Sequence, residues 1–425
     1  MLLRVLLLLL LAAPVAPAAA YSVLTHQAVI DSTWEPCLVP LLRQRYPGAT
    51  AEEWTRAKSY AYGGAIVQDL GYYPLGTKFF TNLTHYVRAG DFVRSLLGQA
   101  HNRDEYAFAL GALAHYAADN TGHPLGTNLI MASVYPKLQA TYGPVITYED
   151  APKRHTELEF SFDVVQIAAG RFRSQEYHKF IGFRVSKPVL ERAFLETYGL
   201  ELGQVLFDPD LDVATFRFAV NQLLPAAARA AWQSQRKEIR RLSPRARRRE
   251  YLYRANRREF RKEFGTSYER PGLGARLVAL VLKVLPKIGP LKTYAFTLPD
   301  AAGEAQFRRS YRAALAAYCA LAQLQPTDTS KALPLLPDSN LDTGEPTQPA
   351  TYALADATYA KWLRALYQHN LARTPLAVRH DLARYFAQGL PLTQPKHGKK
   401  PSRRKARKER RESEAALAEL RALPQ

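Results

Sequence analysis

Histidine and carboxylate side chains recur at four-residue steps in two segments of the sequence. His115, Asp119 and His123 follow one another at this step, and His155 and Glu159 repeat it further along. In a helix, residues four apart leave the same face one turn apart. Two helices that each present a histidine and a carboxylate supply the nitrogen and oxygen donors of a metal cluster in a helical bundle. The spacing therefore predicts a buried metal site.

The types of these donors indicate which metal would bind and for what purpose. Neutral imidazole and carboxylate suit zinc, and no thiol lies nearby, which favours a hydrolytic over a structural site. A lone histidine is more often a surface or hydrogen-bonded core residue, and a single HxxxD or HxxxE pattern arises by chance in many helices. Here six of the ten histidines lie between His26 and His155, so the joint spacing favours a cluster. Gly111 and Ala112 on the first helix are expected to leave space for ions.

Helices are the elements expected to position these side chains. Between Tyr21 and Leu223 apolar residues recur mostly with a helical period, interrupted by Gly and Pro turns, and strand-like alternation is scarce. The sequence predicts an all-α, multi-helix bundle with the metal site in its core and helical C-terminal extensions. Helical segments are expected at residues 105–119, 156–169, 235–264 with a break near Pro244, 307–324, 351–368 and 376–387, with a small polar helix at the end of the tail. Residues 276–285 form a short, strongly apolar stretch.

The N-terminal residues have the features of a secretory signal peptide. Arg4 precedes an apolar run from Val5 to Leu11, and Ala18, Ala19 and Ala20 offer a cleavage site of small residues. The apolar run is shorter than the ~20 residues of a membrane-spanning helix. We therefore expect cleavage after Ala20 and a secreted or periplasmic protein. Its two cysteines, Cys37 and Cys319, allow at most one internal disulfide, and the sequence leaves open whether they pair.

Two short segments carry nearly all of the formal net charge of +20. Residues 236–262 hold 13 basic and 3 acidic side chains, and residues 396–411 hold 10 and 1, so these segments account for 19 of the 20 charges. The folded body is therefore nearly neutral. The expected organisation is a signal peptide (1–20), a helical catalytic domain (21–325) that includes the basic segment 235–264, a Pro-rich linker or loop (326–350), a helical extension (351–392) and a basic tail (393–425).

Four segments together resemble the bacterial zinc-dependent phospholipases C. They are Tyr21-Ser-Val-Leu-Thr-His26, Gly64-Ala-Ile-Val-Gln-Asp69-Leu-Gly-Tyr-Tyr-Pro74, Thr84-His85-Tyr86 and Leu113-Ala-His115-Tyr-Ala-Ala-Asp119-Asn-Thr-Gly-His123-Pro124. The resemblance covers roughly residues 21–162. These enzymes form a larger group with the fungal single-strand-specific nucleases, and the resemblance implies that group's all-helical fold and trinuclear zinc cluster.

The resemblance also assigns metal ligands, position by position. It implies that one zinc is held by Asp69, His85, His115 and Asp119, and a second by His123, His155 and Glu159. The third would be held by His26, by Asp119 as a bridge, and by the amino group and carbonyl of the mature N-terminal residue, Tyr21. The family usually has Trp at that position, but backbone ligation tolerates Tyr. The free amine exists only after the leader is removed, so cleavage would complete the site.

The expected reaction is hydrolysis of a phosphodiester. Close zinc ions polarise the ester and lower the pKa of water towards ~7, and Asp69 would orient or deprotonate the attacking water as a catalytic residue. Glu159 and the turn after Asp69 both resemble the phospholipase branch. Aromatic side chains near that turn are candidates to hold a quaternary ammonium head group by cation–π contact, although such residues are more often core packing. These candidates are Tyr72, Tyr73, Phe79 and Phe80.

Two other functions are left open by the sequence. The basic segments would suit the backbone of a nucleic acid, which is the main argument for a single-strand-specific zinc nuclease. The tail at residues 396–411 has no aromatic residue for base stacking, however. The basic segments and the apolar stretch 277–285 would also suit peripheral contact with an anionic membrane surface. A noncatalytic, metal-stabilised envelope-binding protein is the third candidate, which the large donor set disfavours.

Overall fold

The computed structural model describes most of the chain after the expected leader. The described residues are 22–73, 76–169, 171–172, 182–218, 297–326 and 331–391, residues 402–424, and a few isolated positions within 236–247 and 328–397. Within them the chain forms helices and no β-strand, with one isolated β-bridge between Ser339 and Pro346. The predicted all-α fold is confirmed.

The helices before residue 170 carry the predicted ligands. They are α2 (Val23–Thr33), η1 (Trp34–Leu38), α3 (Val39–Arg45), α4 (Ala51–Gly64), η2 (Val67–Tyr72), α5 (Lys78–Tyr86), α6 (Ala89–Gly98), α7 (Arg103–Gly122), η3 (His123–Thr127), α8 (Asn128–Val134), α9 (Pro136–Tyr142) and α10 (Pro152–Ala168).

The later helices flank this group. They are α12 (Lys187–Tyr198), α13 (Leu202–Val205), α14 (Pro209–Phe218), α18 (Ala301–Gln323), α19 (Ala353–Gln368), η8 (Leu371–Arg373), α20 (Leu376–Tyr385) and α21 (Arg403–Ala422).

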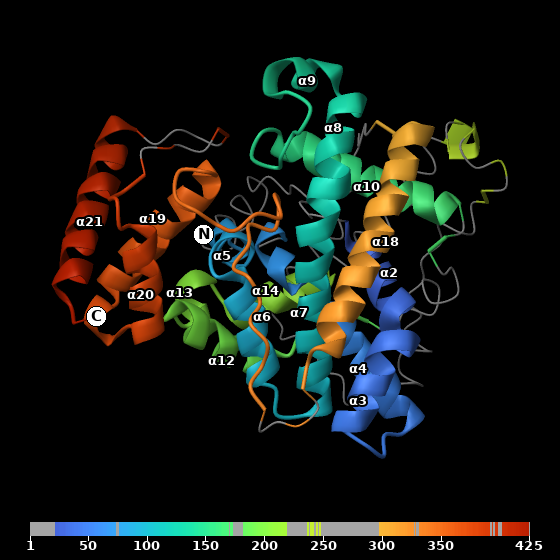
Figure 1. Ribbon diagram of the computed structural model, residues 1–425, viewed down its shortest axis with the longest axis horizontal. Helices are drawn as coiled ribbons and strands as arrows, with labels where there is room; N and C mark the ends of the chain where they lie inside the picture. Colours follow the sequence, from blue (N-terminus) through green and yellow to red (C-terminus); the bar gives the residue numbers. More distant parts are fainter. Residues whose placement is uncertain are drawn as a thin grey trace, which may run out of the picture.

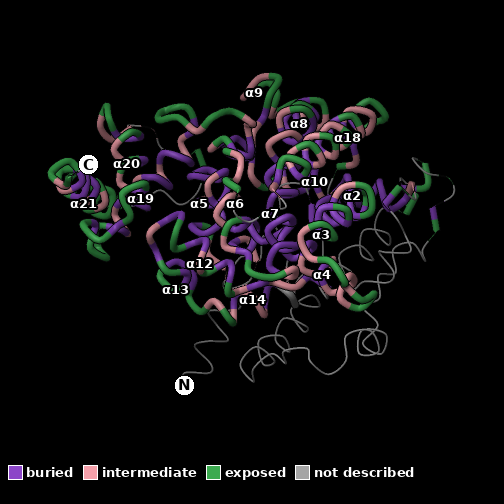
Figure 2. The backbone as a smooth tube through the Cα atoms, turned by 60° about the horizontal axis from the view of Figure 1, so that its bottom comes forward, coloured by how far each residue is buried: buried purple, intermediate pink, exposed green. Residues whose placement is uncertain are grey.

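Helix α7 is the central element of the bundle. Its apolar and small residues lie on all sides rather than on one stripe, a pattern that requires burial all round. Most of the helix is buried, and α4, α6 and α18 lie alongside it (Figures 1 and 2). Asn102 caps its first turn by accepting a hydrogen bond from the Glu105 N–H at 3.0 Å. The helix that presents His115 and Asp119 is thus held by neighbours on several sides.

Glycine allows α4 and α7 to approach at backbone contact. A Cβ at Gly111 would overlap the Ala61 carbonyl oxygen, and one at Gly64 would overlap the Phe108 carbonyl oxygen. The expectation that Gly111 leaves space for ions is therefore wrong, because the backbone of α4 occupies that space. The close approach instead brings the end of α4, and the turn that leads to Asp69, against α7, which carries His115 and Asp119.

A disulfide joins an N-terminal helix of the bundle to a helix much later in the sequence. Cys37 in η1 and Cys319 in α18 are bonded, with their Cα atoms 5.7 Å apart and 282 residues between them in sequence. The sequence left open whether these two cysteines pair. Since α18 also packs along α7, the bond connects the N-terminal helices to a neighbour of the central helix.

Helices α19, α20 and α21 form a group at one end of the molecule (Figure 1). The indole N–H of Trp362 in α19 donates to the Tyr198 carbonyl oxygen at 2.8 Å, which fixes this group to the end of α12. The C-terminal half of α21 buries Ala416, Leu417 and Leu420. Its first half exposes seven basic side chains: Arg403, Arg404, Lys405, Arg407, Lys408, Arg410 and Arg411.

The expected helices at 105–119, 156–169, 307–324, 351–368 and 376–387 correspond to α7, α10, α18, α19 and α20. The C-terminal helix α21 is longer than expected and includes most of the basic tail. The predicted helix at 235–264, apart from isolated positions, and the apolar stretch at 276–285 lie outside the described residues. None of the helices in the described ranges has the length and apolar character needed to span a membrane.

Substituting Gly111 by Ala tests the close approach of α4 and α7. The added methyl group would force backbone atoms apart, so the free energy of unfolding should fall by about 1–3 kcal/mol. Gly203→Ala is the matched control, because a Cβ at Gly203 meets no atom within 4 Å. Urea unfolding of both variants measures the difference, and equal stabilities would contradict the packing described for this crossing.

Candidate metal centre

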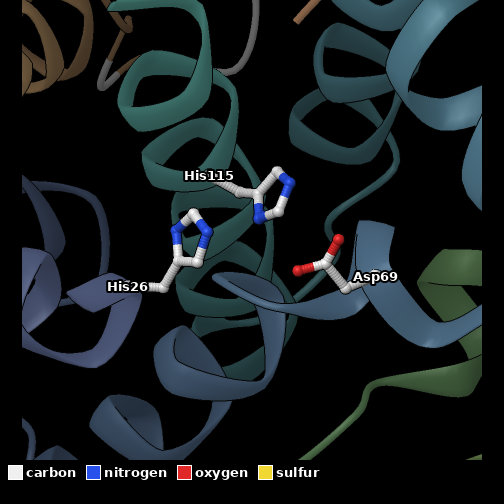
Figure 3. A group of neighbouring side chains, drawn as sticks. All are labelled: His26, Asp69 and His115. Atoms are coloured by element: carbon white, nitrogen blue, oxygen red, sulfur yellow. The ribbon is translucent and has the colours of Figure 1, made fainter. Parts of the chain in front are cut away.

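Six elements bring eight of the predicted ligands into one buried region. Each of these side chains is at most 2% exposed. Three of them, contributed by α2, η2 and α7, point towards one another in Figure 3. The eight are His26 of α2, Asp69 of η2, His85 of α5, His115 and Asp119 of α7, His123 of η3, and His155 and Glu159 of α10. The ninth predicted ligand, Tyr21, lies outside the described residues.

Asp119 lies at the centre of the first group of donors. Its Oδ2 is 3.1 Å from His115 Nε2 and 3.7 Å from His85 Nε2, while its Oδ1 is 3.4 Å from His26 Nε2. Asp69 Oδ1 lies 3.4 Å from His85 Nε2. Two donors bound to the same zinc ion at about 2.0–2.1 Å in tetrahedral geometry lie roughly 3.4 Å apart. The two oxygens of Asp119 thus face different histidines, as a bridging carboxylate would.

A second group forms where η3 meets α10. Glu159 Oε1 lies 2.9 Å from His155 Nδ1 and 3.4 Å from His123 Nε2. His155 and Glu159 are one turn apart in α10, and His123 follows directly after α7, so the same helix connects both groups. One ring nitrogen of each histidine thus lies near the same carboxylate oxygen, while the compact donor triads of the described residues belong to the first group: His26, Asp69 and His115, and His85, His115 and Asp119.

Backbone carbonyls orient two of the three histidines of the first group. His85 Nδ1 lies 2.8 Å from the Thr81 carbonyl oxygen and His115 Nδ1 lies 2.9 Å from that of Ala65. A carbonyl oxygen can only accept a hydrogen bond, so Nδ1 carries a proton in both rings, and Nε2, on the side of Asp119, is the nitrogen left for a metal ion. This is the arrangement in which neutral histidines bind metal.

The buried carboxylates fit a metal because little else in the described part of the chain satisfies them. None of the oxygens of Asp69, Asp119 and Glu159 accepts a hydrogen bond of good geometry from a described residue. Buried oxygens without a hydrogen bond are costly, and ion coordination removes that cost. The donors are nitrogen and oxygen only, as zinc sites of hydrolases have.

The charges of this region favour the ionised form of Asp119, whereas burial raises the pKa of Asp69. Burial would raise the pKa of Asp119, but His115, His123 and His26 outweigh it and hold that pKa well below its usual range. Burial would lower the pKa of His115, but the Asp119 carboxylate outweighs it and raises the pKa to about 9. A metal ion must therefore displace a proton from His115, and its binding should weaken as the pH falls.

The sequence analysis assigned no role to Asp342, which the structure places at the second group. Its Oδ1 lies 3.4 Å from His123 Nδ1 and 3.7 Å from His155 Nε2. The residue belongs to the segment 326–350, expected to be a Pro-rich linker or loop. An acidic residue before Thr343 and Gly344 suggests a turn, and no local pattern distinguishes it from an ordinary loop residue.

The four aromatic candidates have different surroundings. The Tyr72 ring lies 6.4 Å from the His85 ring and 5.9 Å from the Tyr148 ring. Tyr73 packs edge-on against Phe216, and Phe80 is fully buried and stacked on Phe194. The ammonium group of Lys361 lies 4.2 Å from the centre of the Phe79 ring. Tyr72 thus adjoins a predicted ligand, whereas Phe80 has the surroundings of a core residue.

Changing Asp119 to Asn should remove at least one zinc ion from the purified protein. The neutral amide cannot bridge two ions or balance the three histidines, so metal content should fall from the expected two to three per chain. Elemental analysis after dialysis measures this. Asp381→Asn is the control, since Asp381 is a buried carboxylate that contacts Arg384 and Tyr359 in and beside α20. Unchanged zinc content in Asp119→Asn would contradict the bridging geometry.

Comparison with known families locates this centre in a recognised domain. Residues 25–207 match the family described as zinc dependent phospholipase C. No curated protein and no solved structure matches the chain. The matched range contains all eight of the ligand side chains placed above, from His26 to Glu159. The resemblance drawn from the sequence is therefore confirmed, and residues 25–207 form a domain of the zinc-dependent phospholipase C family.

Proposed function

We propose that the protein is an exported, zinc-dependent phospholipase C that cleaves a glycerophospholipid into diacylglycerol and a phosphorylated head group. Membership of the family supports a phospholipase C-like phosphodiester hydrolase. The observation that carries the proposal is the convergence of eight buried nitrogen and oxygen donors on two groups joined by α7. A noncatalytic binding protein would not need so large a donor set.

Three zinc ions would be held by the two groups and the mature N-terminus. Asp69, His85, His115 and Asp119 would hold the first, His123, His155 and Glu159 the second, and His26, Asp119 and the backbone of Tyr21 the third. Bound zinc supplies a Lewis acid for the phosphodiester and water acidified to a pKa of about 7.

Asp69 is the residue proposed to handle the water proton. Neither of its carboxylate oxygens accepts a hydrogen bond of good geometry within the described chain. One oxygen can therefore face the first donor group, where it lies 3.4 Å from His85 Nε2, while the other accepts the proton.

Tyr72 is the best placed of the four aromatic candidates for the head group. Its ring is a neighbour of both the His85 and the Tyr148 rings, beside the proposed metal centre. The negative face of an aromatic ring attracts a quaternary ammonium group. Tyr73, Phe79 and Phe80 are kept as weaker candidates, because their recorded neighbours are packing residues and Lys361.

The exposed basic half of α21 would favour contact with an anionic membrane surface over binding of a nucleic acid. The helix carries no aromatic residue, so it lacks stacking partners for single-stranded bases. Part of its charge is balanced by Glu409, Glu412 and Glu414 one turn away. The single-strand nuclease remains the alternative function, because basic side chains would also suit the phosphate backbone of a nucleic acid.

Export fits the disulfide between Cys37 and Cys319, because such bonds persist in oxidising compartments. A secreted or periplasmic location is therefore proposed. The expected signal peptide, residues 1–20, lies outside the described residues.

Assays on two substrates separate the candidate functions. The processed protein should release diacylglycerol from short-chain phosphatidylcholine, while its hydrolysis of single-stranded DNA should stay at background. A chelator should abolish the phospholipase activity. Zinc should restore it. Nucleotide release without diacylglycerol would establish the nuclease instead, and full activity of metal-free protein would exclude both zinc enzymes.

Processing at Ala20 should complete the third zinc site. Asp163, one turn beyond Glu159 in α10, accepts hydrogen bonds from the Leu24 N–H at 3.1 Å and the Thr25 hydroxyl at 2.7 Å. These contacts hold the start of α2 beside the metal centre. A form that retains the residues before Tyr21 should contain one zinc fewer and lose most activity. Equal zinc content in processed and unprocessed protein would show that the N-terminus is not a ligand.

A further inference from the structure

Residues 336–347, called here the crossing loop, run alongside α6 and α7 between α18 and α19 (Figure 1). The Tyr116 hydroxyl of α7 donates to the Pro337 carbonyl oxygen at 2.8 Å, and the Asp91 N–H of α6 donates to Asp338 Oδ1 at 2.9 Å. The Leu341 N–H donates to the carbonyl oxygen of His85, a predicted ligand, at 3.1 Å. The crossing loop is thus bonded to the elements that position the metal centre.

Asp342 is the residue of this loop that enters the centre. It is buried, and its Oδ2 accepts hydrogen bonds from the Tyr352 hydroxyl at 2.6 Å and the Tyr148 N–H at 2.8 Å. These two bonds fix the carboxylate plane and leave Oδ1 towards His123 Nδ1 and His155 Nε2. Oδ1 is also buried, and its 3.4 Å separation from His123 Nδ1 is shorter than its 3.7 Å separation from His155 Nε2, so His123 is its nearer ring.

Asn128 connects the same loop to the second histidine. Its side-chain amide N–H donates to the Asp342 carbonyl oxygen at 2.6 Å, and its Oδ1 lies 2.8 Å from His155 Nε2. Because the amide nitrogen is used on the carbonyl, the oxygen must face the ring and accept from it. His155 Nε2 therefore carries the proton, and Nδ1 presents its lone pair to Glu159.

The same reasoning separates the two faces of the histidine pair. Glu159 contacts His123 Nε2 and His155 Nδ1, whereas Asp342 contacts the other nitrogen of each ring. Because Nε2 of His155 carries its proton, this ring can bind metal only through Nδ1, on the Glu159 face. Asp342, on the opposite face, would then orient the imidazole rings rather than bind the ion.

The backbone of the crossing loop is shaped to reach this position. Gly344 has a φ of +76°, a conformation that favours glycine. A Cβ there would lie 2.8 Å from the Asn120 carbonyl oxygen and 3.0 Å from Pro124 Cγ, so the loop packs against the turn that carries His123. A larger residue would push Asp342 away from the ring.

We propose that Asp342 is a positioning residue of the metal centre: its carboxylate fixes the His123 ring, and its carbonyl fixes the His155 ring through Asn128. The crossing loop, which lies beyond the matched residues 25–207, thereby completes the second metal site. The inference rests on the proposed function only in requiring that this centre binds zinc. Outer partners of metal-bound histidines commonly contribute 10–100-fold to metal affinity.

The test is the zinc affinity of three variants, measured by competition with a chelator. Asp342→Ala should weaken one zinc site by about 10–100-fold, and Asp342→Asn, which keeps an acceptor oxygen, should weaken it less. Tyr352→Phe, which keeps the carboxylate but removes one bond that orients it, should act in the same direction. Asp338→Asn is the matched control in the same loop, because an amide oxygen can still accept from the Asp91 N–H.

Cobalt substitution supplies a readout that a purely structural loss would not give. The visible absorption of one cobalt site should change in Asp342→Ala while the other sites keep their spectra, and Asp338→Asn should match the unmodified protein. Wild-type affinity and spectrum in both Asp342→Ala and Tyr352→Phe would overturn this inference alone. An unmodified protein that binds no zinc would overturn the proposed function and this inference together.

Discussion

Asp119 is a carboxylate buried at the middle of the bundle, and its charge needs compensation that the helices alone do not provide. Histidines from three elements surround it, at 3.1 Å for His115 Nε2 and 3.4 Å for His26 Nε2. Burying an ionised carboxylate without a partner has a large free-energy cost, so charged or hydrogen-bonding neighbours are needed to stabilise it. Much of the bundle's architecture meets this requirement, because the elements around α7 deliver donors or hold those that do.

The crossing of α4 and α7 shows how packing serves that requirement. Small residues let the two backbones touch, which places the Ala65 carbonyl oxygen where it accepts the Nδ1 proton of His115. Asp69 follows within η2, directly after this contact. A wider helix separation would remove the acceptor and displace Asp69 together. The close contact between the α4 and α7 backbones therefore also determines the positions of His115 and Asp69.

The predictable parts of this protein are those encoded locally. Four-residue steps predicted that His115 and Asp119 share a face, and α7 confirms that they do. The starts of α7 and α18 were placed too late, although Asn102 and Asp300 are recognisable caps. The space expected at Gly111 was wrong because a sequence pattern cannot show which neighbour fills a gap. Asp342 was missed because its role depends on a contact across more than two hundred residues, for which the loop has no local signal.

The position of α18 has a consequence for the order in which the protein is made. The ligand side chains from His26 to Glu159 are synthesised early, but α18 covers α7 only after residues 301–323 exist. Its Tyr318 hydroxyl donates to the Leu110 carbonyl oxygen at 2.9 Å, next to the close crossing, and its Cys319 closes the disulfide. Between residue 159 and residue 301 the nascent chain thus carries all eight predicted ligand side chains without the helix that covers α7. The packing of α18 along α7 consequently requires the chain up to residue 323 rather than the first half alone.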